Sequence, residues 1–336
     1  MSPERQRIAA AFLARAGWGQ ARSEALPGDA SFRRYHRLFL GDRRALLMDA
    51  PPDKEDVRPY VRIARLLAKL GFSAPAILAE APAEGMLVIE DFGDDTYTRL
   101  LARGQDEGAL YRLATDLLIE LRRRFQPADG EGVPAYDDQR LLTEASLLTD
   151  WFLPAATGRA TPAGLREEYL ALWRALLPVA RGVPDTLVLR DYHIDNLMLV
   201  AGRTGTAACG VLDFQDAVIG PASYDLVSLL EDARRDVAPD LAASLYRRYE
   251  AAFPAGDRAA FDASYAVMGA QRNAKIVGIF TRLCVRDGKR GYLAHIPRVW
   301  RLLEGDLKHP TLAAMRQWFD RHVPAELRAV PRSLAA

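Results

Sequence analysis

The stretch Leu187–Val200 constrains this chain more than any other. Two short apolar runs at its ends bracket a polar loop that holds Asp191 and, five residues later, Asn196. Asp213 follows 22 residues after Asp191 and ends another apolar run. Short apolar runs bounded by turn-forming residues predict strands. The pattern therefore predicts a strand, a loop, a strand and a further strand, with all three polar residues at strand edges.

This order of acid, amide and acid is typical of phosphoryl transfer by kinases. Asp191 fits the base that orients an acceptor hydroxyl and takes its proton. Asn196 and Asp213 fit a Mg²⁺ site, because Mg²⁺ prefers oxygen ligands and keeps several waters. Each residue alone also has a plain explanation as a turn former or loop cap. The three together favour an ATP-dependent kinase of a small molecule.

Motifs of other enzyme classes are missing from the sequence. It contains no GxxxxGK[ST] phosphate loop, no GxGxxG that opens a helix, no HExxH and no GxSxG elbow. His193 lies inside the polar loop, where we expect a stabilising hydrogen bond rather than acid–base work.

Charge and composition give no reason to expect nucleic acid or a membrane surface as a partner. The 336 residues include 45 basic and 44 acidic side chains. No apolar run approaches the roughly 18–20 residues of a membrane span. Cys209 and Cys284 are far apart, as expected for reduced core thiols of a cytoplasmic protein. No obligate protein partner is evident, and residues 1–17 read as a structural helix in preference to a transit peptide.

Hydrophobic periodicity predicts two lobes joined by a hinge. In the first lobe we expect helices at Pro3–Ala16 and Pro59–Leu70, a hairpin of Tyr35–Leu40 with Ala45–Asp49, and a strand at Met86–Glu90. The acidic link Asp91–Asp95 then forms the hinge. In the second lobe we expect helices at Asp106–Phe125, Asp137–Phe152, Pro162–Ala180, Tyr224–Asp236, Asp240–Ala252, Arg258–Val285, His295–Gly305 and Thr311–His322. A strand at Ala207–Leu212 is expected to complete a small antiparallel unit with the Leu187–Val200 strands.

These residues resemble the aminoglycoside phosphotransferase and choline kinase-like families, which share the protein-kinase-like fold. Arg190–Asn196 is similar to their Brenner motif, and Asp213–Asp216 with Tyr224–Leu226 to their metal-binding segment and following helix. The resemblance covers nearly the whole chain. It implies an α+β, two-lobed protein-kinase-like fold, with a small β-containing N-lobe (1–91) and a mostly helical C-lobe (92–336). It also implies ATP and Mg²⁺ as cofactors.

A closer resemblance links the chain to bacterial anomeric sugar kinases of cell-wall recycling. It rests on Gly28–Tyr35, Leu47–Pro52, Asp213–Ala217 and Gln271–Asn273. Members phosphorylate N-acetylmuramate and N-acetylglucosamine at the anomeric hydroxyl, and their products feed UDP-sugar synthesis. The resemblance implies a small amino-sugar substrate and a role in peptidoglycan recycling. Two alternatives stay open: a kinase of another metabolite of the aminoglycoside, choline or homoserine type, and a nucleotide-binding pseudokinase.

Nucleotide contacts are expected from two segments of the first lobe. A turn-forming loop can bring backbone N–H groups to phosphates, although an ordinary hairpin turn explains it as well. Its candidate residues are Gly28, Ser31, Phe32 and Arg33, and backbone groups near Glu90 and Phe92 are expected to hold adenine. One departure from the family is Met48, which stands where these kinases place a phosphate-binding lysine. Substitute cations are Arg33, Arg34, Arg44 and Lys54.

The acceptor pocket is expected along the helix that contains Gln271 and Arg286. Gln271, Lys275, Gly278, Arg282 and Arg286 recur near helix spacing and form either a solvated face or the polar wall of a pocket. A carboxylate-bearing sugar suits cations, since arginine matches planar carboxylates. The candidate acceptor residues are Arg272, Asn273 and Lys275 on this helix, and Gln215 and Asp216 after the metal-binding acid. Asp225 is expected to fix the polar loop from behind.

Overall fold

A computed structural model describes residues 2–27 and 32–334. By the density of contacts, the chain divides into two packing units. Unit 1 comprises Met1–Glu120 and Ile194–Ala217, and unit 2 comprises Leu121–His193 and Val218–Ala336. One boundary falls inside helix α4 (Glu107–Arg124). This division by contacts does not test the lobe boundary predicted at residue 91, which stays a prediction.

Unit 1 is built on a five-stranded antiparallel sheet with the strand order β1-β2-β3-β5-β4. The strands are β1 (Arg22–Ala25), β2 (Arg34–Leu40), β3 (Arg43–Asp49), β4 (Ile77–Ala81) and β5 (Met86–Ile89). The predicted hairpin is β2–β3, and its turn contains Gly41 at a positive φ of 58°. β1 and β4 were not predicted. β1 is exposed along its whole length and therefore carries no apolar alternation.

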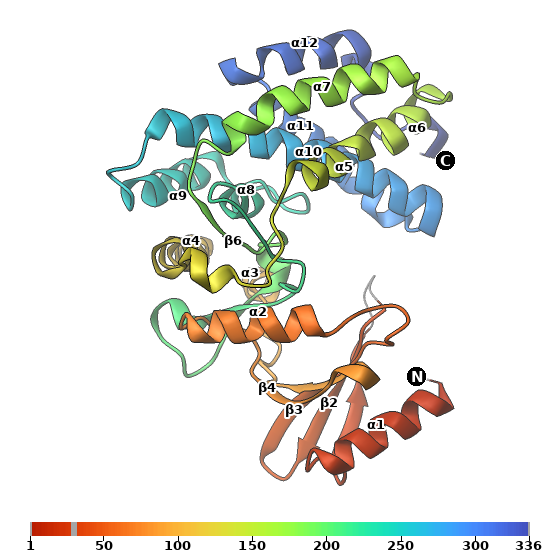
Figure 1. The fold of residues 1–336 in the computed structure, drawn as a ribbon, viewed down its shortest axis with the longest axis vertical. Coiled ribbons are helices and arrows are strands. Elements are labelled where there is room, and N and C mark those ends of the chain that lie inside the picture. The colour runs from red at the N-terminus through yellow and green to blue at the C-terminus, as the bar shows by residue number, and fades with distance from the viewer. Residues whose placement is uncertain (1, 28–31, 335–336) are drawn as a thin grey trace. The chain divides into compact units, whose positions relative to one another are not determined.

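One face of this sheet is closed by helix α1 (Pro3–Arg15), as Figure 1 shows. Phe12 of α1 packs in one buried cluster with Leu38, Ala45 and Leu47. The Ser2 side chain caps the helix by accepting a hydrogen bond from the Arg5 N–H. Because side chains alternate along a strand, the residues between these core positions point to the opposite face of the sheet.

The predicted three-stranded antiparallel unit around the polar loop is wrong in one pairing. β7 (Leu197–Leu199) pairs with β8 (Cys209–Val211) as expected. β6 (Asp185–Val188) instead pairs with β9 (Val218–Pro221), a strand that was not predicted. β6 and β9 belong to unit 2, whereas β7 and β8 belong to unit 1. The apolar runs themselves do not encode which partner each strand takes.

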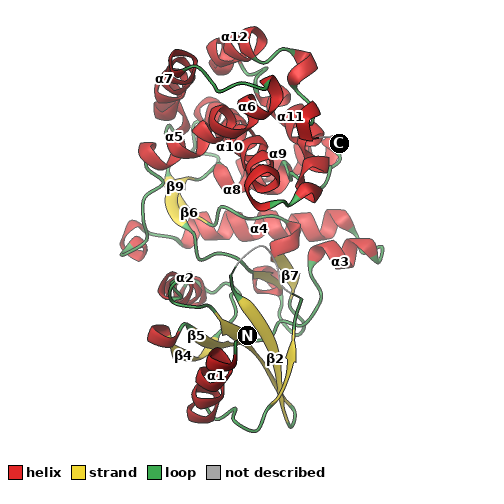
Figure 2. Cartoon of the chain, turned by 90° about the vertical axis from the view of Figure 1, so that its right-hand side faces the viewer, coloured by secondary structure: helices red, strands yellow, loops and turns green. Residues whose placement is uncertain are grey.

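Unit 2 is a helical assembly around the long helix α10 (Arg258–Asp287), which α5, α7, α8 and α11 contact (Figure 2). Its other helices are α5 (Asp138–Leu147), α6 (Leu153–Thr157), α7 (Ala163–Ala180), α8 (Tyr224–Leu230), α9 (Pro239–Ala251), α11 (Ile296–Asp306) and α12 (Ala313–His322). A π-helical segment, Leu148–Phe152, joins α5 to α6. Unit 1 adds α2 (Arg58–Lys69) and α3 (Tyr97–Ala102). All predicted helices are present, although α8 is shorter than predicted, and α3 and α6 were not predicted.

Both cysteines are free and buried, as predicted. Within residues 2–27 and 32–334, no helix is both long and apolar enough to cross a membrane.

Two helical glycines give a matched test of the packing in unit 2. A Cβ on Gly278 of α10 would lie 2.3 Å from the Leu147 carbonyl carbon, whereas a Cβ on Gly305 of α11 would meet nothing within 4 Å. We expect Gly278→Ala to lower the free energy of unfolding by about 1–3 kcal/mol or more. Gly305→Ala should raise it by about 0.5–1 kcal/mol, since alanine is the better helix former. Denaturant unfolding measures both, and equal effects would contradict the close contact.

Candidate functional site

A cavity of about 340 Å³ in unit 1 collects several predicted site residues. Its walls come from β2, β3 and β5, from the link after β5, and from the segments around Asn196 and Asp213. Glu90 and Phe92 also line it. The fold therefore brings both predicted metal-binding residues and both predicted adenine-side residues to one cavity.

Asp213 has a defined set of partners within unit 1. Its Oδ1 accepts hydrogen bonds from Arg33 Nη2 at 2.9 Å and from Gln215 Nε2 at 3.1 Å. Arg33 also donates to Gln215 Oε1 at 2.7 Å and pairs with Glu55 at 3.1 Å. The Asp213 side chain remains 39% exposed. The predicted loop residue Arg33 is thus tied directly to the predicted metal-binding acid.

The backbone of Asp213 is also strained. Among the described residues other than glycine, only Arg190 and Asp213 have positive φ, at 70° and 56°. A non-glycine residue in this region costs about 1–3 kcal/mol and persists only where its surroundings hold it. Such strain is concentrated at functional sites, and here it falls on one acid of the predicted triad and on the residue before the other.

The face of the sheet that lines this cavity lacks a lysine on β3. Register places Tyr35 opposite Met48 and Arg37 opposite Leu46, so these four side chains share one face. Met48 is fully buried, and Tyr35, Arg37 and Leu46 line the cavity. Among the described strand residues that line the cavity, the cation is Arg37, on the neighbouring strand β2.

Arg37 was not predicted as a site residue, although the hairpin register could have indicated it. It pairs with the Asp91 carboxylate at 2.8 Å and with Asp94 at 3.1 Å. Of the predicted substitute cations, Arg34 and Arg44 are exposed, and Lys54 pairs with its neighbour Asp53 at 3.3 Å.

Several contacts fix the end of β5 and the start of the link that follows it. The Glu90 N–H donates to the Ala76 carbonyl at 2.9 Å, so sheet-edge pairing already uses this donor. Glu90 Oε1 pairs with Arg203 at 2.6 Å, and the Arg203 guanidinium lies 5.1 Å from the Phe92 ring centroid. A Cβ on Gly210 would lie 2.8 Å from the Phe92 ring, so this glycine admits the aromatic side chain.

The predicted phosphate loop is described only in part. Gly28 and Ser31 lie outside the described residues. The Phe32 side chain is 61% exposed, and its N–H donates to Glu55 Oε1 at 3.2 Å.

In unit 2, helix α8 holds the polar loop from behind, as predicted for Asp225. Its carboxylate accepts from the Leu189 N–H at 2.6 Å and from the Arg190 N–H at 2.9 Å. Ser228 Oγ donates to the Arg190 carbonyl at 3.2 Å. Burial raises the pKa of Asp225 to about 7, even though the two N–H groups favour its charged form. Asp191, the predicted base, follows directly and is exposed.

His193 has the stabilising contact predicted for it. Its Nε2 lies 3.2 Å from Arg234 Nη1. Because a guanidinium can only donate, Nε2 accepts in this contact and the imidazole ring is neutral.

The family model described as "Phosphotransferase enzyme family" matches residues 23–262. The chain belongs to this family. An N-acetylmuramate/N-acetylglucosamine kinase of Caulobacter vibrioides is 40% identical over 363 aligned positions, which cover 98% of this chain and 99% of the relative. A protein of the same name from Pseudomonas aeruginosa is 40% identical and covers 89% of each chain.

A solved structure of wild-type aminoglycoside 2'-phosphotransferase-IIIa in complex with GDP matches with a TM-score of 0.61 at 16% identity. The match covers 90% of this chain and 98% of that one. At this identity the likeness shows the fold alone. The predicted α+β kinase-like fold, with its sheet in the N-terminal region and helices in the C-terminal region, is confirmed.

The predicted acceptor residues of this phosphotransferase occupy different surroundings. Gln215 and Asp216 follow Asp213, and Gln215 Nε2 contacts both acids. Arg272 and Asn273 are buried in α10 instead of lining an open pocket. Arg272 donates to Ser228 Oγ at 2.9 Å and to the Glu231 carbonyl at 3.3 Å.

Of the two alternatives for this face of α10, the solvated face is wrong over most of its length. Gln271, Lys275 and Gly278 are buried, and only Arg286 at the end is exposed. α10 is surrounded by other helices, so polar residues at helix spacing here form internal hydrogen bonds. Gln271, for example, donates to the Leu141 carbonyl at 3.0 Å.

Two acids of this phosphotransferase, the half-buried Glu231 and the buried Asp306 in unit 2, are expected to make its stability depend on pH. Asn273 Nδ2 donates to Glu231 at 2.7 Å and to Asp306 at 2.9 Å. Burial raises the pKa of both acids, and the charge of Glu231 raises that of Asp306 further. The folded state therefore binds more protons than the unfolded state above the ordinary carboxyl range, and stability falls as pH rises through the raised pKa values.

We expect Asp306→Asn to remove part of this loss. The free energy of unfolding of the variant relative to the parent should shift in favour of the variant as pH rises above the ordinary carboxyl range. Denaturant unfolding at a series of pH values measures the shift. Asp240→Asn, at an exposed position of α9, serves as the control. Its free energy of unfolding should change with pH in the same way as that of the parent. A pH-independent difference for Asp306→Asn would contradict the raised pKa values.

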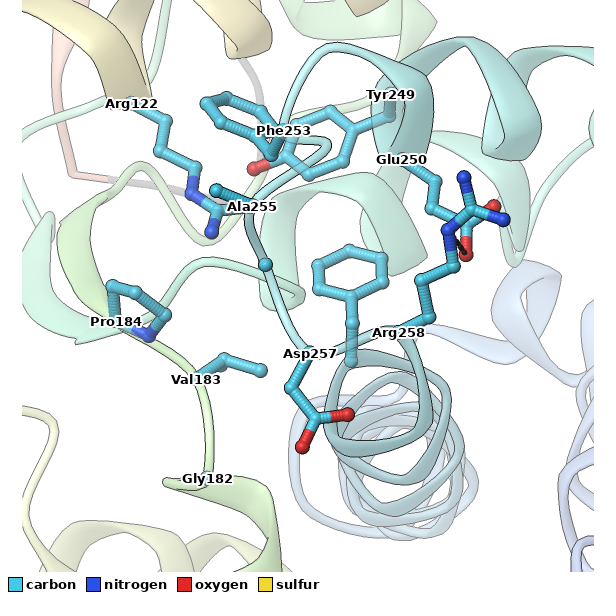
Figure 3. A pocket seen from close by; sticks show the side chains of 12 residues that line it. Arg122, Gly182, Val183, Pro184, Tyr249, Glu250, Phe253, Ala255, Asp257 and Arg258 are labelled. Carbon is cyan, nitrogen blue, oxygen red and sulfur yellow. Dashed lines mark ion pairs between the residues drawn. The ribbon is translucent and has the colours of Figure 1, made fainter.

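A second cavity, of about 270 Å³, lies in unit 2 beside α9 and the start of α10. Figure 3 shows Arg122 reaching toward the Phe253 ring, whose centroid lies 3.8 Å from the guanidinium carbon. Glu250 and Arg258 form an ion pair at 3.5 Å on its other side. None of the predicted site residues lines this cavity, so we do not assign the chemistry to it.

Proposed function

We propose that this phosphotransferase transfers the γ-phosphate of ATP to the anomeric hydroxyl of N-acetylmuramate and N-acetylglucosamine. The observation that carries the proposal is the 40% identity to the Caulobacter kinase across nearly the full length of both chains. The order of Asp191, Asn196 and Asp213 supports phosphoryl transfer independently of that relative.

In the proposed reaction, Asp191 orients the anomeric hydroxyl and accepts its proton. The freed oxygen attacks the γ-phosphorus in line, the bond to the β,γ-bridging oxygen breaks, and the products are a sugar 1-phosphate and ADP. Asp225 and Ser228 keep the Leu189–Arg190 backbone in the conformation that presents Asp191. Catalysis of this type depends mainly on positioning and on charge neutralisation.

Asn196 and Asp213 would hold Mg²⁺, which when bound neutralises phosphate charge. Among residues 2–27 and 32–334, no cluster of three or more His, Cys, Asp or Glu side chains could hold a metal. One carboxylate and one amide in a common cavity nevertheless suit an ion that keeps most of its waters. Arg33 already neutralises Asp213 Oδ1 at 2.9 Å, and we propose that it turns to the phosphates when nucleotide binds.

The cavity in unit 1 would hold the nucleotide. We propose that Glu90 and Phe92 border the adenine and that Gly28, Ser31, Phe32 and Arg33 cover the phosphates. Arg37 also lines this cavity, where its charge is matched by Asp91 and Asp94. A cytoplasmic role in peptidoglycan recycling completes the proposal, in keeping with ATP as the donor and with two free, buried cysteines.

An ADP-release assay on the full chain tests this function. The acceptors are N-acetylmuramate, N-acetylglucosamine, an aminoglycoside, choline and homoserine, each with ATP and Mg²⁺. We expect turnover with the two amino sugars and a product whose phosphate sits on the anomeric carbon by ³¹P NMR. Turnover only with one of the other acceptors would replace the substrate class, and ATP binding without any turnover would favour a pseudokinase.

A further inference from the structure

Unit 2 contains a charged cluster next to the polar loop, which we call the acceptor-side cluster: Tyr136, Glu144, Arg190, Tyr224 and Lys275. Glu144 is its centre, because Arg190 Nη2 and the Tyr136 hydroxyl both donate to its carboxylate. Lys275 Nζ lies 3.2 Å from Glu144 Oε2 and donates to the Tyr224 hydroxyl at 2.7 Å. Lys275, predicted to touch substrate, is therefore already bound to protein groups.

The cluster carries one more positive than negative charge. Burial alone raises the pKa of Glu144, but Lys275 and Arg190 outweigh burial and lower it below the ordinary value. Burial lowers the pKa of Lys275, and Glu144 more than restores it. All three groups are thus charged at neutral pH, and the sum of two cations and one carboxylate is +1.

The excess charge is presented at Arg190. Its side chain is 22% exposed, against 15% for Glu144 and 9% for Lys275. Arg190 directly precedes Asp191. Burial lowers the pKa of Arg190, but the Glu144 carboxylate, with smaller effects of the two tyrosines and Asp191, raises it above the ordinary value. Glu144 holds the Arg190 guanidinium, and Asp225 accepts a hydrogen bond from the Arg190 backbone N–H. A pre-positioned, partly exposed guanidinium beside the predicted base is suited to an anionic group of the acceptor.

We propose that the acceptor-side cluster recognises the carboxylate of an acidic sugar acceptor, with Arg190 as the contacting residue. Glu144 and Lys275 set its position and the net charge. The inference rests on the proposed function, within which the two sugars differ by the lactyl ether of N-acetylmuramate. A guanidinium binds such a carboxylate through two parallel hydrogen bonds. N-acetylglucosamine has no group for this contact, so the cluster affects the ratio of the two specificities.

The test is the ratio of kcat/KM for N-acetylmuramate to that for N-acetylglucosamine. General damage to the polar loop lowers both values and leaves their ratio unchanged. Lys275→Met makes the cluster neutral and should lower the ratio by about tenfold, while Glu144→Gln should raise or maintain it. The double variant, which again carries +1, should return to within about threefold of the parent ratio. The methyl ester of N-acetylmuramate, which keeps the lactyl group but not its charge, should show no response.

A second measurement needs no variant and covers the case in which Lys275→Met fails to fold. Raising the ionic strength of the parent enzyme should raise KM for N-acetylmuramate more than for N-acetylglucosamine or the ester, since salt screens a partly exposed ion pair. The proposal is overturned if the ratio of the two kcat/KM values is the same in all variants and salt raises KM equally for all acceptors. The cluster would then have a structural role only. If the parent turns over neither sugar, it is the proposed function that fails.

Discussion

Replacing Asp191 with asparagine is expected to reduce phosphoryl transfer by about 10³–10⁴-fold while leaving nucleotide binding intact. The loss follows from removing the group that takes the acceptor proton. Binding should survive because Asp191 does not line the cavity of unit 1, which holds the candidate nucleotide residues. Stability should change little, since Asp191 is exposed. ADP release gives the rate, and titration with ATP and Mg²⁺ gives the affinity.

Asp195→Asn is the matched control. Asp195 lies four residues further along the same loop and accepts a hydrogen bond from the Thr98 hydroxyl. We expect its rate to stay within about tenfold of the parent, since it has no assigned role with the reacting atoms. Near-parental activity of Asp191→Asn would show that another group takes the proton.

The second large effect is expected for Asp213→Asn. Asparagine tolerates the left-handed backbone conformation at this position better than most residues, so the substitution tests the charge and not the fold. Loss of the carboxylate should lower kcat by about 10³-fold or more. It should also remove most of the gain in ATP affinity that Mg²⁺ gives to the parent. Titration with ATP, with and without Mg²⁺, measures that gain separately from turnover.

Asp216→Asn controls for a general effect of charge in the same segment. It lies three residues further on and contacts Gln215 at 3.3 Å. We expect it to keep the Mg²⁺-dependent gain in affinity. If Asp213→Asn kept the same gain, the metal-binding assignment would be contradicted.

Local pattern predicted much of the fold. The β2–β3 hairpin and the long helices are encoded by residues close in sequence. The missing pieces depend on contacts between distant segments. β1 was missed because it is exposed along its length, and β6 was given the wrong partner because its strand pairing with β9 spans some thirty residues. An apolar run predicts a strand, but it does not predict which other strand will pair with it.

In the candidate site, too, the residues encoded by local sequence could be predicted, and the contacts between distant segments could not. Asp191, Asn196 and Asp213 could be found because a short loop and one strand end carry them. The ion pairs Arg33–Asp213 and Glu144–Arg190 join residues far apart in the chain, so no motif or spacing in the sequence predicts them. Arg272 and Asn273 were assigned to a pocket because polar residues in a helix suggest an open face. In α10, which is surrounded by helices, these residues are buried: Arg272 donates to Ser228 and Asn273 donates to Asp306.

The division of the chain between its packing units has a consequence for biosynthesis. The chain passes from one unit to the other after Glu120, after His193 and after Ala217. Unit 1 therefore lacks its last strand pair until residue 217 has left the ribosome, and all of 121–193 is made before then. Neither unit is a continuous segment, so neither can be completed before part of the other has been synthesised. We expect cooperative completion late in synthesis, and fragments cut at residue 91 or 120 to be unstable alone.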